Sequence, residues 1–252
     1  MAAHALTCLV LRKRDLGERD RIVTLLTRER GKLDAVVQGA RKPGSKSSGA
    51  SEVFTEARIQ YADGRSLGIV TQWDIVRPYV ELRSNLGMLA RAAYVCEVTE
   101  RMVDEAEPCA DVYDLLSAAL TLIEAAHGDP DIVVRTFLLR LLGERGYGLT
   151  LDLCVRCGKL PRTDGLALSP SFGGVLCAGC ARTTEDRIRL HKDVIPALRN
   201  LSEISVDGLA KLTLPPPIGN QVDLCLKACL RWRCESDIRS ERFLALVRAG
   251  EV

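Results

Sequence analysis

The first 80 residues alternate short apolar runs with turn signals, a pattern typical of small β structures. Branched apolar side chains dominate the runs, and Asp63-Gly64 is a hairpin turn signal between the last two. The basic, Gly/Ser-rich stretch 39–51 predicts a mobile loop. Five short strands predict a small barrel; an OB-fold fits this description, and an SH3-like barrel has a similar signature. The predicted strands span residues 5–11, 21–27, 33–37, 52–61 and 67–76.

After Pro78 the apolar spacing changes from two residues to the three or four of a helix. Asp129 and Pro130 suit the start of one helix, which is apolar on most sides and is therefore expected at the centre of a bundle. The predicted helices span about 86–103, 112–126, 130–146, 190–203 and 217–248, the last with a break near Ser236. The sequence thus predicts an α+β protein with a barrel domain at 1–80 and a helical domain at 81–252.

Four cysteines interrupt the helical part in the pattern C-x2-C, nineteen residues, C-x2-C. They are Cys154, Cys157, Cys177 and Cys180. Two such pairs are typical of a tetrahedral zinc site with four thiolate ligands. Four unlinked core thiols or a redox C-x-x-C explain two pairs less well. We expect one Zn²⁺ in a module at about 150–182, and its filled ligand shell leaves no position for a catalytic water.

The other cysteines are interpreted as core residues. Ile218, Val222, Cys225, Cys229 and Trp232 step by three or four residues, which predicts one buried helix seam rather than a second metal site. The remaining cysteines, Cys234, Cys8, Cys96 and Cys109, are scattered.

The charge is unevenly distributed although the net charge is only +2. Residues 1–50 hold eleven Lys/Arg against five Asp/Glu, whereas residues 81–150 hold six against twelve. A basic segment on one domain favours nucleic-acid binding, and a solvated face with nothing bound is the alternative. The acidic stretch 97–114 is interpreted as such a solvated face.

No enzyme signature stands out. Neither a phosphate-binding Gly-rich loop nor an H-E-x-x-H zinc motif occurs, and the three histidines lie far apart in the chain. Residues 1–11 are too short for a signal peptide before the basic residues that follow, and no apolar run approaches about twenty residues. We expect a cytoplasmic protein, associated with the nucleoid, that is not an enzyme.

Several of these segments together resemble the bacterial recombination mediator RecO family. The motif is GERDRIVTLLT at 17–27, followed by Gly31-Lys32-Leu33 and by Gly39-Ala40-Arg41-Lys42. Asp74-Ile75, LLGERGYG at 141–148, the four cysteines and a C-terminal helix pair follow in the order found in that family.

The resemblance implies an OB-fold, a helical domain and a zinc-finger-like insertion. It also implies a protein that binds single- and double-stranded DNA, anneals complementary strands and, with RecR, loads RecA onto DNA coated by single-stranded DNA-binding protein. Family members also bind the acidic C-terminal tail of that coating protein. For this tail the resemblance points to Arg135, with Leu139 and Arg140 beside it.

The candidate DNA-binding residues are the cations of the N-terminal segment, since phosphate neutralisation needs Lys and Arg. They are Arg12, Lys13, Arg14, Arg19, Arg21, Arg28, Arg30, Lys32, Arg41, Lys42 and Lys46. The barrel region holds only four aromatic residues, so base stacking is expected to contribute little. A zinc-stabilised protein that only bridges other proteins is the alternative of a different class.

Overall fold

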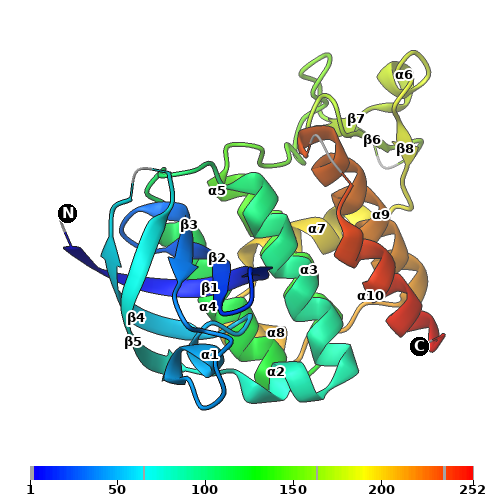
Figure 1. Cartoon of the computed structure of the whole chain (residues 1–252). Helices are drawn as coiled ribbons and strands as arrows, with labels where there is room; N and C mark the ends of the chain where they lie inside the picture. The colour runs from blue at the N-terminus through cyan, green and yellow to red at the C-terminus, as the bar shows by residue number, and fades with distance from the viewer. Residues whose placement is uncertain (1–2, 65, 163, 235–236, 252) are drawn as a thin grey trace. The chain divides into compact units, whose positions relative to one another are not determined.

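A computed structural model describes residues 3–64, 66–162, 164–234 and 237–251 (Figure 1). The chain forms two compact units, one of Met1–Ala125 with Ile238–Val252 and one of Ala126–Asp237. Each unit is described by itself. The domain boundary at 80 and the module limits expected from the sequence stay predictions.

Five strands of the first unit close into a barrel in the order β1-β2-β3-β5-β4. Neighbouring strands are antiparallel except β3 and β5, which pair in parallel through Ala35–Gly68 and Val36–Ile69. This non-sequential order fits the OB-fold description and confirms the predicted barrel. The strands are β1 (Ala3–Leu16), β2 (Asp20–Thr27), β3 (Gly31–Val37), β4 (Glu56–Ala62) and β5 (Gly68–Arg77).

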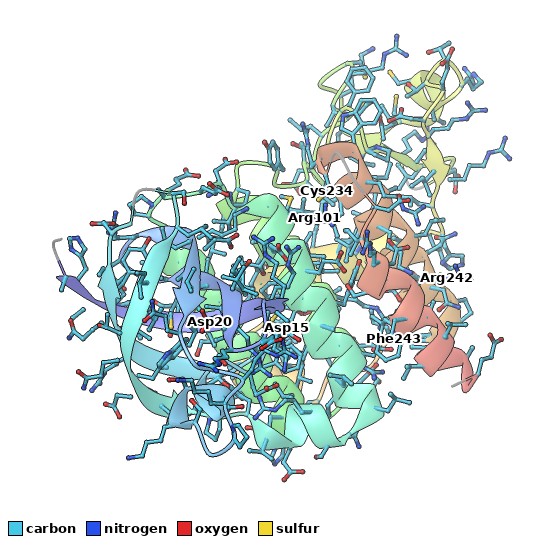
Figure 2. The ribbon with its side chains drawn as sticks, in the orientation of Figure 1. Asp15, Asp20, Arg101, Cys234, Arg242 and Phe243 are labelled. Carbon is cyan, nitrogen blue, oxygen red and sulfur yellow. The ribbon has the colours of Figure 1, made fainter. Side chains whose placement is uncertain are left out.

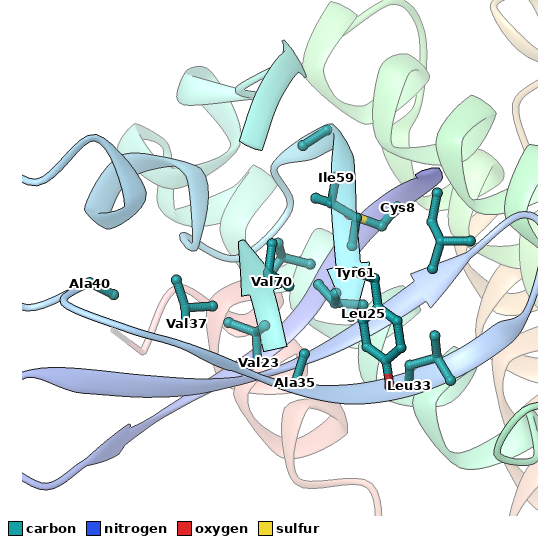
Figure 3. Close-up of a cluster of buried hydrophobic side chains, with 13 residues drawn as sticks. Cys8, Val23, Leu25, Leu33, Ala35, Val37, Ala40, Ile59, Tyr61 and Val70 are labelled. Atoms are coloured by element: carbon teal, nitrogen blue, oxygen red, sulfur yellow. The ribbon is translucent and has the colours of Figure 1, made fainter. Parts of the chain in front are cut away.

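The barrel interior is filled by one layer of alternating side chains (Figure 3). Leu33, Ala35 and Val37 point inward from β3 while the residues between them are half-buried, as the two-residue period of a strand requires. The ring of Tyr61 passes directly over Gly68, where an added Cβ would lie 2.1 Å from the ring. Each large apolar side chain buried here stabilises the barrel by roughly 1.5–3 kcal/mol.

Helices complete the first unit, and one of them corrects a prediction. The stretch 39–51 was expected to be a loop throughout, but Lys46–Ala50 forms the short helix α1. Its carbonyl at Ser48 and the hydroxyl of Ser51 accept hydrogen bonds from Arg21, so a tertiary contact supports a turn of helix that local sequence does not favour. The other helices are α2 (Val80–Ser84), α3 (Leu86–Met102), α4 (Ala110–Ala125) and α10 (Arg239–Ala249).

The second unit is a helical bundle with the four-cysteine module. Helix α5 begins where predicted, and the Asp129 side chain accepts a hydrogen bond from the N–H of Asp131 at 2.9 Å. Ten residues of α5 are buried. The helices are α5 (Pro130–Glu144), α7 (Val194–Glu203), α8 (Val206–Leu209) and α9 (Pro216–Arg233). The module adds β6 (Ala167–Ser169), β7 (Gly174–Leu176), α6 (Ala178–Ala181) and β8 (Ile188–Arg189).

Most of the predicted cysteine seam on α9 is buried. Cys225 and Cys229 lie in the core, but Trp232 is 57% exposed, so its assignment to the seam was wrong. Trp232 lies in the last turn of α9, which ends at Arg233. The predicted break near Ser236 lies outside the described residues.

Among the described residues, no helix combines the length and apolarity that crossing a bilayer requires.

Candidate nucleic-acid interface and metal centre

The turn between β1 and β2 is tied to the loop that follows β3. The N–H of Gly39 donates to the Asp20 carboxylate at 2.8 Å, and the N–H of Arg41 donates to the carbonyl of Arg19 at 2.9 Å. The Arg41 guanidinium also donates to the carbonyl of Gly17 at 2.5 Å. Asp20 and Asp15 mark this end of the barrel in Figure 2. Two basic segments that are far apart in sequence therefore meet.

This junction gathers Arg19, Arg41, Lys42 and Lys46, which we call the hairpin–loop cluster. All four residues are exposed. Arg41 pairs with Asp15 at 3.4 Å, and its neighbour Lys42 has its stem over Gly39. In the described part of the chain no carboxylate is paired with Arg19, Lys42 or Lys46. The cluster therefore offers positive charge that the protein itself does not neutralise.

The candidates on β1 and β2 are more strongly engaged with carboxylates of their own unit. Arg21, only 15% exposed at its side chain, contacts Glu52 at 3.0 Å and Asp15 at 3.6 Å. Lys13 contacts Glu52 at 2.5 Å. Burial acts to raise the pKa of Glu52, but these two cations outweigh it and hold the pKa below its usual value. Arg21 is thus a structural residue of this corner.

The side chains of Arg12 and Arg14 are more exposed to solvent than that of Arg21. Arg12 lies 3.2 Å from Glu100 and Arg14 lies 3.8 Å from Asp34, and both side chains remain about half exposed. Exposed pairs of this kind contribute about 0–1 kcal/mol, so a stronger anion can displace the carboxylate.

The candidates at the opposite end of β2 are not brought to the cluster. Arg28 donates to both carboxylate oxygens of Asp114, at 3.0 and 2.8 Å, and Arg30 donates to Asp63 at 3.0 Å. The Lys32 ammonium donates to the carbonyl of Glu100 at 2.7 Å. Since β2 is eight residues long, roughly 23 Å separates its two ends. The eleven candidates therefore do not form one compact patch.

The aromatic residues of the barrel region face inward. Phe54, Tyr61 and Tyr79 are buried, and Trp73 packs against the barrel core. Base stacking needs an exposed ring. The three buried rings cannot offer one in this conformation, and Trp73 is only partly accessible. Binding at this surface would rest on phosphate contacts, as the sequence predicted.

The four predicted metal ligands converge. The sulfur atoms of Cys154, Cys157, Cys177 and Cys180 all lie within 4.8 Å of one another, and those of Cys157 and Cys177 are 3.9 Å apart. Four sulfurs around a tetrahedral Zn²⁺ at about 2.3 Å would lie about 3.8 Å apart. The cluster can therefore hold a metal ion.

Short strands and tight turns place these sulfurs. Cys177 follows β7 directly and begins α6, while Gly158, with φ of 69°, closes the first pair by donating its N–H to the Cys154 carbonyl at 2.8 Å. Burial acts to raise the pKa of Cys154, but N–H groups of Cys177, Cys157 and Arg156 outweigh it and lower the pKa to about 6. These donors favour the thiolate, which is the form that binds metal.

The residues predicted to meet an acidic partner lie on α5. The Arg135 side chain is 8% exposed, and its Nε and Nη2 donate to the Asp223 carboxylate at 2.9 and 3.0 Å. Leu139 is buried, and Arg140 donates to the carbonyl of Ile204. A tail contact by Arg135 stays a prediction and would require the pair with Asp223 to open.

Sequence reasoning missed the role of the acidic stretch 97–114. Expected to be a solvated face, it supplies Glu97 to the N-terminus of α10, Glu100 to Arg12 and Asp114 to Arg28. These partners are 50 or more residues away, so no local pattern could have shown them. The surplus of acid in 81–150 beside a surplus of base in 1–50 was the available signal.

Comparison with known proteins gives the same family over both units. The family model "Recombination protein O N terminal" matches residues 1–79, and "Recombination protein O C terminal" matches residues 83–242. A protein of Symbiobacterium thermophilum named "DNA repair protein RecO" is 32% identical over 99% of this chain and 100% of its own length.

Two further relatives with that name come from Pelotomaculum thermopropionicum and Anaeromyxobacter dehalogenans. The first is 32% identical over 97% of this chain and 94% of its own length. The second is 35% identical over 95% of this chain and 94% of its own length. With both family models matched in order and relatives aligned over nearly the whole chain, this protein belongs to the RecO family of DNA repair and recombination proteins.

Proposed function

We propose that this protein is a recombination mediator that binds single- and double-stranded DNA and anneals complementary strands without making or breaking covalent bonds. The observation that carries the proposal is the hairpin–loop cluster, where Arg19, Lys42 and Lys46 present charge with no carboxylate paired to it in the described chain. These cations would bind phosphates.

Annealing suits such a surface. Two complementary strands repel each other through their phosphates, and neutralising that repulsion lets the bases find their partners. Three of the four barrel aromatics are buried and Trp73 is partly buried, so the barrel offers little ring surface to hold bases stacked away from pairing. Phosphate contacts carry little sequence information, which allows any pair of strands to be joined.

The metal in this proposal is one structural Zn²⁺ held by the four cysteines. Four thiolates complete a tetrahedral shell, so the ion would stabilise the module and would not activate water. The protein that merely bridges others is the alternative, and it predicts no salt-sensitive affinity for DNA.

The proposed partners are RecR and the C-terminal tail of single-stranded DNA-binding protein. Together with RecR, the protein would load RecA onto the coated DNA. These proposals rest on membership of the family. Arg135, Leu139 and Arg140 are the proposed tail contacts, with the Arg135–Asp223 pair opening on binding. Work on chromosomal DNA would place the protein in the cytoplasm at the nucleoid.

The experiment compares two triple variants of the full chain. The first, Arg19→Ala/Lys42→Ala/Lys46→Ala, removes the unpaired cations of the cluster. The second, Arg28→Ala/Arg30→Ala/Lys32→Ala, removes equal charge from the other end of β2. Binding of a fluorescent single-stranded oligonucleotide is measured by anisotropy at several salt concentrations, and annealing is followed with a labelled complementary strand.

The first variant should lose affinity and annealing rate, and its log–log salt slope should be shallower by about 2, because each phosphate contact on a single strand contributes about 0.7. The second should stay close to the unmodified protein. If both variants bind and anneal normally, the assignment of the cluster is wrong. If the unmodified protein binds DNA weakly and without salt dependence, the bridging protein becomes the better description.

A further inference from the structure

The four-cysteine module has a second feature, a hollow of about 620 Å³ with three arginines around it. Its charged lining residues are Arg182, Arg187 and Arg189, all exposed. The rest of the lining is small or apolar and consists of Gly165, Leu166, Ala167, Ala178, Ala181 and Leu190. Among the described residues, no Asp or Glu lines it. We call this feature the arginine hollow.

The three arginines come from two segments of the module, the end of α6 and the region of β8. Strand β8 pairs with β6 through Ala167–Arg189 and Leu168–Ile188, so β8 carries Arg189 to the wall that β6 forms. Arg187 lies directly before β8, two residues from Arg189, and both line the hollow. Arg182 directly follows α6, the short helix of the module labelled in Figure 1, and also lines the hollow.

The hollow is open because its other lining residues are small. Gly165 has φ of 70°, and a Cβ added there would lie 2.8 Å from the Cβ of Ala178. The position therefore excludes larger side chains. Arg187 is braced by a 2.7 Å hydrogen bond to the carbonyl of Thr184. Arg182 and Arg189 have no carboxylate partner among the described residues, so both remain available to a ligand.

We propose that the arginine hollow binds the sugar-phosphate backbone of a polynucleotide, as a second DNA-binding surface separate from the barrel. The guanidinium fork matches phosphate geometry with two parallel hydrogen bonds. Arg187 and Arg189 lie two residues apart and both line the hollow, so one strand could meet both guanidinium groups. The lining holds no aromatic ring to anchor a peptide side chain or to read a base.

This inference extends the proposed function without depending on it. The barrel would carry one phosphate-binding surface, and the arginine hollow would add a second one in the other unit. A protein with two such surfaces can hold two strands at once, which would speed their annealing.

The test uses a double variant of the full chain, Arg182→Ala/Arg189→Ala. Arg187 is left in place because it braces Thr184. The matched control is Lys211→Ala/Arg231→Ala, which removes the same charge from exposed positions of the same unit that do not line the hollow. Metal content and thermal unfolding establish that both variants are folded.

Each double substitution is also made in the Arg19→Ala/Lys42→Ala/Lys46→Ala background, so that barrel binding and hollow binding are read separately. With a fluorescent single-stranded oligonucleotide, the hollow variant should lower affinity and reduce the salt slope by about 1.4 in either background, and the control should change neither. Annealing should slow more than binding weakens, since one of two held strands is lost.

The proposal is overturned if the hollow variant and its control bind and anneal alike. It is also overturned if polyglutamate binding is lost in the hollow variant while DNA binding is kept, because the site would then serve an acidic polypeptide. If the Arg19→Ala/Lys42→Ala/Lys46→Ala variant binds DNA normally, the proposed function is contradicted. The comparison of the hollow variant with its control still tests the arginine hollow in that case.

Discussion

The carboxylate of Glu97 accepts hydrogen bonds from the backbone N–H of Ser240 at 2.8 Å and from the Ser240 hydroxyl at 2.6 Å. Arg101, one turn after Glu97 on α3, is labelled in Figure 2. The Glu97 carboxylate also accepts the N–H of Arg239 at 3.1 Å. Because the residue that precedes α10 makes no side-chain cap, Glu97 serves as the cap of that helix from 143 residues away. The contact joins the C-terminal helix to α3 in the first unit.

Replacing Glu97 should therefore loosen α10. Burial acts to raise the pKa of Glu97, but the hydrogen bonds from Ser240 and Arg239 outweigh it and hold the pKa below its usual value. A carboxyl with a lowered folded pKa stabilises the fold above its unfolded pKa, about 4.3, and this stability is lost as the pH falls through the folded value. The Glu97→Gln variant should cost about 1–3 kcal/mol near pH 7.

Chemical denaturation of both proteins between pH 3 and pH 7 measures this difference. It should be constant above about pH 5 and should shrink below about pH 4.3, where the native carboxyl takes up a proton. A difference that does not change over this range would mean that the charge of Glu97 is irrelevant and that Gln merely packs less well.

The buried pair of Arg135 and Asp223 predicts a strong dependence on both partners. The side chains are 8% and 14% exposed, so removal of one takes the nearest opposite charge from a buried partner; Arg135 would keep the more distant Asp129 at 4.0 Å. Asp223→Ala should cost about 3–5 kcal/mol, and Arg135→Met/Asp223→Leu should be more stable than either single variant. Urea denaturation of the four proteins gives the coupling energy, and additive effects would show that the pair is not coupled.

Metal removal should unfold the module and spare the barrel. The Cys177→Ser variant is expected to lower the metal content from one ion per chain to near zero, because one of four converging sulfurs is lost. Amide exchange should become fast in residues 150–190, since structural zinc contributes on the order of 10–16 kcal/mol in finger peptides. Exchange in β1–β5 should not change.

The control is Cys225→Ala, because Cys225 is buried on α9 and takes no part in the sulfur cluster. Elemental analysis should find the full metal content in that variant. Retention of the ion by Cys177→Ser would contradict the four-thiolate assignment.

Gly31 should tolerate no side chain. Its φ is 68°, and an added Cβ would lie 1.9 Å from the carbonyl oxygen of Glu107. Gly31→Ala is therefore expected to cost more than the roughly 1–2 kcal/mol of left-handed backbone strain. Gly17 is the matched control, with φ of 59° and no atom within 4 Å of an added Cβ. Equal thermal unfolding of Gly31→Ala and Gly17→Ala would show that the turn can move away from Glu107.

The sequence by itself determined the five barrel strands, the long helices and the four converging cysteines, but not the short elements such as α1. Apolar runs rich in branched residues, separated by turn signals, marked five strands. Asp129 marked the start of α5, because its carboxylate can reach the next free N–H groups. The C-x2-C spacing of Cys154 and Cys157 predicts a short turn that brings their sulfur atoms together. This half of the cluster could therefore be predicted from local sequence.

Only the tertiary structure decided which charges are free. Arg28 and Arg19 look alike in the sequence, yet Arg28 is held by Asp114, 86 residues away, while Arg19 lies exposed beside Arg41. The arginine hollow likewise exists because β8 pairs with β6. Electrostatic interactions depend on distance in space and on burial, and the chain folds distant segments together, so no local pattern can assign the partner of a charge.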